Sequence, residues 1–348
     1  MMTASKTRLW ALAAVAAVAL GMAPPAVAGK ITKMAVLAPE KGTDFGWNQQ
    51  GVEAAKKAGA ALGIEVAVAD GLGYGDVRPV MRELIADGAQ LLIAHASGYN
   101  TAGPEIAAET GTPVLVVDNP GAVKKGLVAD YTVSGHEGAY LAGFLAAKMT
   151  RTGTLGIVVS GEPPAWNAQS AGFAQGAKAA RPDIKLRYAV IGPAAYGDVA
   201  GGKRVTASVI AAGADIVFGQ GNGSSFGMIQ AVETTKAVDG GKVWFIDVIG
   251  DKRSLDKGNL LSSVLWDLTP TFTAAIRDLE GGTFGTHSYA IGLADGSVQL
   301  LDTGHADPAA WKATMAVRDK ILSGAIRVAQ IFDAAKVRAM MTELDINK

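Results

Sequence analysis

The chain has 348 residues, and its 32 lysines and arginines balance its 32 aspartates and glutamates, which gives a formal net charge of +0 at pH 7. This balance argues against a protein that binds nucleic acid or an anionic membrane through bulk charge. The absence of cysteine excludes disulfides, zinc–thiolate sites and thiol nucleophiles. A charged fraction of only 18% with 44 glycines is typical of an α/β protein with buried parallel strands and many tight turns.

Residues 1–28 are predicted to form a secretory signal peptide. Lys6 and Arg8 precede an apolar run at 9–22, and small residues at 26–28 fit a cleavage site. The apolar run is shorter than the roughly 20 residues that span a bilayer, which argues against a membrane anchor. Because no cysteine is available for lipid attachment, we expect a soluble periplasmic protein.

The loop at 41–51 is rich in aromatic and polar residues and lies between a predicted strand and a predicted helix. In open α/β sheets such loops, at the carboxyl ends of strands, are where ligands bind. Aromatic rings can stack on a flat ligand, while carboxylate and amide groups bond to its polar edge. The alternative is a solvent loop with one aromatic residue packed inward. The residues that we predict to contact a ligand here are Asp44, Phe45, Trp47 and Asn48.

The first part of the mature chain alternates apolar runs of strand length with helical stretches, at the roughly 25–30-residue interval of a right-handed βαβ crossover. Ser97 and Tyr99 follow the third predicted strand, and Asp118 follows the fourth. The predicted strands are 34–38, 64–69, 91–94, 114–117 and 127–133, and the predicted helices are 52–62, 76–87 and 104–109.

The pattern then restarts and predicts a second doubly wound half. Trp166, Asn167, Asn222 and Gly223 fall in its strand-end loops, and Asp247 lies near the end of its last strand. The predicted strands are 154–159, 186–191, 216–218 and 243–248, and the predicted helices are 137–149, 167–180, 202–212 and 225–238.

The tail of the chain is too short to form a core of its own. We expect it to cross back between the two lobes and to create a hinge with several crossings. The first lobe is predicted to comprise 29–133 and 263–302, and the second 134–262 and 303–348. The predicted elements of the tail are strands at 260–265, 289–293 and 297–301 and helices at 271–279 and 311–322.

Two facing α/β lobes place their strand-end loops around one cleft, a common place for a small-molecule site. Aromatic residues gather in or beside these loops, and rings of this kind stack on flat heterocycles. The alternative is that each aromatic residue fills the core of its own lobe. Carboxylates such as Asp44, Asp118 and Asp247 suit ligands rich in hydroxyl groups.

Motifs of common enzymes are missing from the sequence. The four histidines do not have the spacing of a zinc protease helix. Ser160 lacks the glycines of a nucleophile elbow, and the glycine-rich segments 71–75 and 219–223 do not fit a dinucleotide fingerprint. We therefore predict a non-enzymatic protein that uses no metal or cofactor.

Several blocks of the chain carry a resemblance to a known family. The sequence resembles the basic membrane protein family of bacterial solute-binding proteins, which includes purine-nucleoside binders of ABC importers. The resemblance covers nearly all of the mature chain. It implies a type I periplasmic binding protein fold, a nucleoside-sized ligand between the lobes, and an ABC permease as partner of what we expect to be a monomer. The blocks that carry it are 44–48, 137–143, 152–156, 166–173, 223–231 and 264–267.

The resemblance and the loop chemistry together define the predicted ligand contacts. By position, the resemblance implicates residues in both lobes, and the aromatic and carboxylate chemistry adds Phe45, Trp266 and Asp247. The full predicted set is Asp44, Phe45, Trp47, Asn48, Ser97, Tyr99, Asp118, Trp166, Asn167, Asn222, Gly223, Asp247 and Trp266.

Two positions depart from the nucleoside-binding relatives. Those relatives carry a pair of aspartates where this chain has Ile249 and Asp251, and Asp247 lies upstream of the pair. They also often carry a lysine where this chain has Trp266. A nucleoside, a purine base or another flat heterocycle therefore all stay open as ligand. The alternative functions are binding of a sugar or flavin-like ligand for uptake, and a sensor that signals to a receptor kinase.

Overall fold

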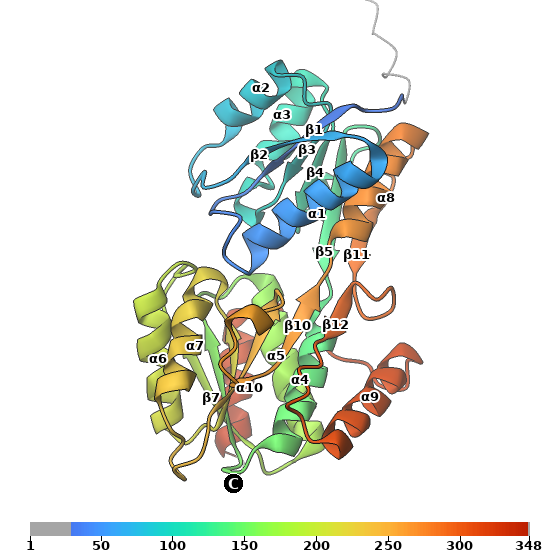
Figure 1. Cartoon of the computed structure of the whole chain (residues 1–348). Helices are drawn as coiled ribbons and strands as arrows, with labels where there is room; N and C mark the ends of the chain where they lie inside the picture. Colours follow the sequence, from blue (N-terminus) through green and yellow to red (C-terminus); the bar gives the residue numbers. More distant parts are fainter. Residues whose placement is uncertain (1–28, 347–348) are drawn as a thin grey trace, which may run out of the picture.

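The computed structural model describes residues 29–346, which form two α/β lobes (Figure 1). The predicted signal peptide at 1–28 lies outside the described residues. In the described part of the chain, no helix has the length and apolar character needed to cross a bilayer.

The first lobe contains a parallel sheet of six strands in the order β11-β5-β4-β3-β1-β2. Its central strands are buried on both faces, which explains their uninterrupted apolar sequences. The strands are β1 Lys33–Leu37, β2 Glu65–Ala69, β3 Leu92–Ala94, β4 Val114–Val117, β5 Val128–Val133 and β11 Ser288–Ile291. The helices are α1 Trp47–Leu62, α2 Arg78–Ala86, α3 Ala102–Thr110 and α8 Thr269–Gly281.

The second lobe repeats this architecture with the strand order β12-β10-β9-β8-β6-β7, in which only β12 runs antiparallel to its neighbour. The strands are β6 Thr154–Val159, β7 Lys185–Val190, β8 Ile216–Gln220, β9 Trp244–Ile249, β10 Leu260–Trp266 and β12 Val298–Leu300. The helices are α4 Gly135–Met149, α5 Pro164–Ala180, α6 Val199–Ala211, α7 Ser225–Thr234, α9 Pro308–Leu322 and α10 Ala334–Ile346. Helix α10, which the sequence analysis did not predict, lies against α5 and β7.

The predicted lobe boundaries in the tail need a correction. The expected first-lobe segment 263–302 contains two pieces of the second sheet, because β10 pairs in parallel with β9 and β12 pairs antiparallel with β10. Only α8 and β11 join the first lobe. The chain therefore passes between the lobes after β5, after β10 and after β11, and these crossings lie side by side in the middle of the molecule (Figure 1).

Helices α4 and α5 pack unusually closely, which accounts for the small residues along both. A Cβ atom added at Gly143 would collide with the backbone carbonyl of Phe173, and one added at Gly176 would collide with that of Tyr140. Both helices are largely buried. This rigid pair forms the base from which the second-lobe loops reach the region between the lobes.

Candidate functional site

A cavity of about 350 Å³ lies between the two lobes. It is bordered by loops that follow β1, β2, β3 and β4 in the first lobe and β6, β7 and β8 in the second, as expected for doubly wound sheets whose carboxyl ends face each other. Its lining residues are Pro39, Trp47, Tyr74, Ala96, Ser97, Gly98, Val117, Asp118, Val133, Pro163, Ala165, Trp166, Ala194, Tyr196, Asn222 and Trp266.

Aromatic side chains form much of the wall of this cavity. The Trp47 ring stacks on His95, with ring centroids 3.9 Å apart and an interplanar angle of 12°, and meets Trp266 edge-on at 6.1 Å. On the second lobe, Trp166 meets Tyr196 edge-on at 5.3 Å. These contacts fix the rings before any ligand arrives, which reduces the entropic cost of binding.

The polar part of the cavity centres on Asp118. The Ser97 hydroxyl donates a hydrogen bond to Asp118 Oδ2 at 3.1 Å. Burial raises the pKa of Asp118 from 3.8 to about 6, the Ser97 hydrogen bond opposes this rise, and the nearby charge of Asp130 adds to it. The lining residues, all from the described part of the chain, include no lysine or arginine. The cavity therefore suits a neutral ligand, or one that donates hydrogen bonds, better than an anion.

Backbone strain marks the same loops. Among the described residues, the non-glycine positions with a left-handed φ include Asp118 at 56°, Ala194 at 52° and Asn222 at 51°, and all of these line the cavity. Phe45 at 52° and Ile249 at 70° lie where the lobes touch. Conformations of this kind cost about 1–3 kcal/mol each and cluster at functional sites.

Several of the predicted contacts lie together in the cavity. The structure brings Trp47, Ser97 and Asp118 of the first lobe into one cavity with Asn222, Trp166 and Trp266. Three tryptophan rings therefore border one gap between the lobes, although Trp166 and Trp266 are also buried side chains.

The predicted contacts Asp44 and Asn48 do not line the cavity and instead hold the start of α1. Asp44 Oδ1 accepts from the backbone N–H groups of Gly46 at 2.9 Å and Gln49 at 3.0 Å. Asp44 Oδ2 accepts from Asn48 Nδ2 at 2.7 Å, and Asn48 Oδ1 accepts from the backbone N–H of Glu40 at 3.2 Å. Their polar atoms are used to shape the loop that presents Trp47.

Other predicted contacts are also absent from the cavity lining. The Phe45 ring meets Phe226 of the second lobe edge-on at 6.1 Å. Tyr99 is fully buried, and its hydroxyl donates to the Gly73 carbonyl at 2.6 Å. Asn167 Nδ2 donates to the carbonyl oxygens of Glu162 at 3.0 Å and Phe332 at 2.8 Å.

Gly223 and Asp247 are likewise displaced from the cavity. A Cβ atom at Gly223 would lie 3.4 Å from the Tyr196 carbonyl oxygen, so this glycine packs under the loop that carries Tyr196. Asp247 is fully buried within its own lobe and forms an ion pair with Lys252 at 3.0 Å. Asp247 is thus enclosed in the second lobe, and Gly223 is half-buried against the loop that carries Tyr196.

Sequence reasoning missed two tyrosines that line the cavity. Tyr74 lies in the glycine-rich segment 71–75, which does not fit a dinucleotide fingerprint, and Tyr196 lies in the loop after β7. Their rings are 6.0 Å apart, one from each lobe. The available signal was an aromatic residue among glycines directly after a predicted strand, which is the same signal that identified Trp47.

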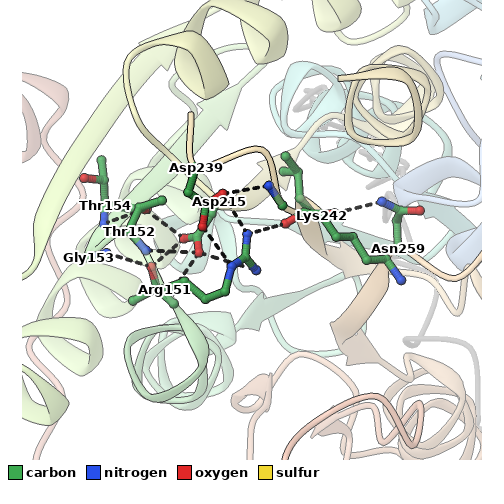
Figure 2. A network of polar contacts seen from close by, with 11 residues as sticks. Arg151, Thr152, Gly153, Thr154, Asp215, Asp239, Lys242 and Asn259 are labelled. Atoms are coloured by element: carbon green, nitrogen blue, oxygen red, sulfur yellow. Dashed lines mark hydrogen bonds and ion pairs between the residues drawn. The ribbon is translucent and has the colours of Figure 1, made fainter. Parts of the chain in front are cut away.

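A second polar network lies at the amino ends of the strands of the second sheet, away from the cavity (Figure 2). Asp215 accepts from the Arg151 backbone N–H at 2.7 Å and from the Thr152 hydroxyl at 3.1 Å. Arg151 also binds the Asp239 carboxylate at 3.0 Å and the Lys242 carbonyl at 2.9 Å. The network joins the amino ends of β6, β8 and β9, so it stabilises the sheet and has no contact with the cavity. Groups of acidic and histidine side chains suited to a metal ion are absent from 29–346.

Comparison with protein families finds a match over most of the chain. Residues 31–331 match the family model described as Bmp, ABC transporter substrate-binding protein PnrA-like.

Individual relatives agree with this family match. The chain is 32% identical over 172 residues to Basic membrane protein A1 of Borrelia garinii subsp. bavariensis, which covers 49% of each chain. It is 32% identical over 133 residues to the ABC transporter nucleoside-binding protein BmpA of Lactococcus lactis subsp. cremoris, which covers 37% of each chain. The chain thus matches about half of the length of these relatives or less.

Among solved structures, the ABC transporter system solute-binding protein from Aeropyrum pernix is similar with a TM-score of 0.76 and 19% identity, over 90% of this chain and 97% of that chain. At this level of identity the likeness concerns the fold alone. It confirms the expected α/β fold of the type I periplasmic binding proteins, with two doubly wound lobes.

Proposed function

This chain belongs to the PnrA-like family of ABC transporter substrate-binding proteins, and on that premise we propose that it captures a nucleoside or a purine nucleobase between its lobes. The resemblance of the sequence indicates the same family. The family binds substrates for transport and is not a family of enzymes.

The observation that carries the proposal is an aromatic cavity with one polar side. Trp47 and Trp166 come from different lobes and line the same space, together with Tyr74 and Tyr196. The volume of about 350 Å³ is within the roughly 300–1,000 Å³ of small-molecule sites. A purine has two π-faces for the rings and an edge of N–H groups, and the Asp118 carboxylate is an acceptor suited to that edge.

The position of the cavity supports a capture mechanism based on closure. The site takes residues from both lobes, so a ligand completes its contacts only when the lobes come together. We propose that the ligand-bound form is then recognised by an ABC permease. A periplasmic location after removal of the predicted signal peptide, and a monomeric state, are parts of the same proposal.

Binding assays with a defined set of ligands test this proposal. Calorimetry with adenosine, guanosine, adenine, riboflavin and ribose should give tight binding to a purine compound, and mass spectrometry should identify a purine in protein purified without added ligand. Binding of ribose or riboflavin alone would replace the purine proposal with the sugar or flavin alternative. Conversion of the purine to another product would show enzymatic activity.

A further inference from the structure

A buried lysine connects the two lobes outside the ligand cavity. Lys252 follows β9 in the second lobe and is only 2% exposed. Its ammonium nitrogen lies 3.0 Å from Asp247 Oδ2 and donates to the carbonyl oxygens of Val248 at 3.0 Å and Phe45 at 2.8 Å. An ammonium group has three N–H donors. Two of their acceptors belong to the second lobe, and the third belongs to the first lobe.

The glycine next to this lysine permits the close approach of the lobes. A Cβ atom added at Gly250 would collide with the Phe45 carbonyl oxygen and lie 2.9 Å from its carbon, and both atoms belong to the first lobe. Within its own lobe the nearest atom is Lys252 Nζ, at 3.6 Å, which is an ordinary contact. A side chain at this position is therefore compatible with the second lobe alone but not with contact between the lobes.

The first lobe has a matching glycine at the same contact. The Trp47 backbone N–H donates to Asn222 Oδ1 of the second lobe at 3.2 Å. A Cβ atom at the adjacent Gly46 would lie 2.8 Å from Asn222 Oδ1 and 3.0 Å from Asn222 Cα. The backbone of the first-lobe loop thus passes directly over that of the second lobe at two neighbouring points.

We propose that Gly250 and Lys252 form a closure latch that sets ligand affinity without touching the ligand. Neither residue lines the cavity. The proposal rests on the proposed function, because it concerns closure around the same site. Asp247, which the sequence analysis placed in the ligand site, positions the lysine of this latch.

The latch acts through the population of the closed form. The apparent dissociation constant of a ligand that requires the closed form rises as the closed fraction falls. When the lobes separate, water must replace the Phe45 carbonyl as acceptor for Lys252. Loss of a hydrogen bond to a charged group weakens closure by an amount that corresponds to about a tenfold change in equilibrium.

The decisive variant is Gly250→Ala, with Gly192→Ala as its matched control. Gly192 is also in a second-lobe loop, but a Cβ atom there would meet only Ala195 of the same lobe at 3.6 Å. Closure is measured by spin labels on Ala60→Cys and Val238→Cys, which are exposed positions in the two lobes of a cysteine-free chain. Affinity is measured by calorimetry with adenosine, and folding by thermal unfolding without ligand.

In the closed form the spin labels at positions 60 and 238 are separated by a short distance. The latch predicts that Gly250→Ala loses this short distance and binds adenosine at least tenfold more weakly. The melting temperature of the unliganded Gly250→Ala protein should stay near that of the wild type, and the Gly192→Ala control should match the wild type in all three measurements. The double variant Asp247→Asn with Lys252→Met removes the interlobe donor without leaving a buried charge unpaired, and it should also weaken adenosine binding about tenfold.

Other outcomes separate the latch from the proposed ligand. If Gly250→Ala keeps both the short distance and the wild-type affinity, the latch is wrong and the nucleoside proposal is unaffected. A second outcome is that the wild type does not bind adenosine, yet shows the short distance without ligand and loses it in Gly250→Ala. In that case the latch holds and the ligand proposal fails. A wild type that never shows the short distance overturns the latch.

Discussion

Individual side chains in the cavity are held by neighbours that do not touch the ligand site themselves. His95 lies beneath Trp47, and its Nε2 is 2.7 Å from the Trp47 carbonyl oxygen. Because a carbonyl can only accept, Nε2 carries the proton, and Nδ1 accepts from the Tyr131 hydroxyl at 2.5 Å. Burial lowers the pKa of His95 to about 4, so the ring is neutral at pH 7. His95 is thus a support for Trp47, which fixes the position of its indole ring.

At the residue scale, truncation of the cavity tryptophans should weaken ligand binding. Stacking on an aromatic ring contributes about 1–3 kcal/mol per base, or roughly 5- to 150-fold in affinity. Trp47→Ala and Trp166→Ala should therefore each bind adenosine more weakly by a factor in this range, as measured by calorimetry. Trp244→Ala is the control, because Trp244 is the first residue of β9, at the opposite end of the strand from the cavity, beside Lys242. Wild-type affinity in both cavity variants would eliminate stacking as a source of binding.

Asp118 should make binding depend on pH. A ligand that donates an N–H group prefers the ionised carboxylate, so adenosine affinity should fall as the pH drops through about 6. Because the Ser97 hydrogen bond opposes the rise in the Asp118 pKa, Ser97→Ala should move the midpoint to higher pH. Asp118→Asn should bind more weakly and without this pH dependence. A pH profile identical in all variants would exclude Asp118 from the contact.

The same carboxyl group has the opposite effect on the stability of the unliganded protein. The pKa of Asp118 is higher in the folded chain than the ordinary 3.8, so the folded state retains its proton more strongly than the unfolded state. This contribution to the free energy of unfolding therefore declines as the pH rises from about 4 to about 6. Denaturant unfolding of Asp118→Asn should lack that decline.

At the scale of elements, the site depends on loops that are shaped by the helices they precede. Asp44 and Asn48 organise the first turn of α1, and this turn presents Trp47 to the cavity. In the second lobe, Trp166 belongs to the first turn of α5, and the close packing of α5 against α4 holds that turn in place. The glycines between these two helices are therefore essential for stability, although they are remote from ligand chemistry.

Substitution of Gly176 tests the close packing of α4 and α5. In Gly176→Val the new side chain would collide with the Tyr140 backbone, which cannot move without displacing α4. Overpacking of this kind costs about 1–3 kcal/mol or more in the free energy of unfolding. Gly281→Ala in α8 is the control, because a Cβ atom there meets nothing within 4 Å. Equal stability of the two variants by denaturant unfolding would contradict the packing described here.

At the scale of the whole molecule, the lobes must separate for a ligand to enter. The chain without cysteine permits a direct test with Gly46→Cys and Asn222→Cys. The Cβ atom at position 46 would lie 3.3 Å from Asn222 Cβ, slightly closer than the roughly 3.5–4.5 Å of a disulfide, and its 2.8 Å contact with Asn222 Oδ1 is lost when Asn222 becomes cysteine. Oxidation in the presence of adenosine should trap the ligand. After reduction, adenosine should dissociate as fast as it does from protein that was never oxidised. Free ligand exchange from the oxidised form would show that lobe separation does not control access.

The sequence predicted the alternation of strands and helices well, because buried parallel strands require continuous apolar runs. It was less successful in the tail. The strand at 260–265 and the strand at 297–301 have no local feature that specifies which sheet they join. Both strands belong to the second lobe because one pairs with β9 and the two pair with each other, and these contacts join segments that are distant in the sequence.

The cavity shows the same division between local and long-range information. Strand-end position identified Trp47, Ser97 and Asp118 from the sequence, since the polar and aromatic content of a loop is a local property. It did not separate them from Asp44 and Asn48, because the two groups differ only in which hydrogen-bond partners surround them in the folded chain.

By itself, the sequence determined the two doubly wound halves and the loops that could contact a ligand, because these follow from residue order and periodicity, while its resemblance to known proteins indicated the family. Only the tertiary structure decided which loop residues line the cavity, which support it, and which join the lobes. Lys252 and Gly250 illustrate the reason: their significance depends on the backbone of Phe45, about 200 positions away in the chain and in contact only after folding.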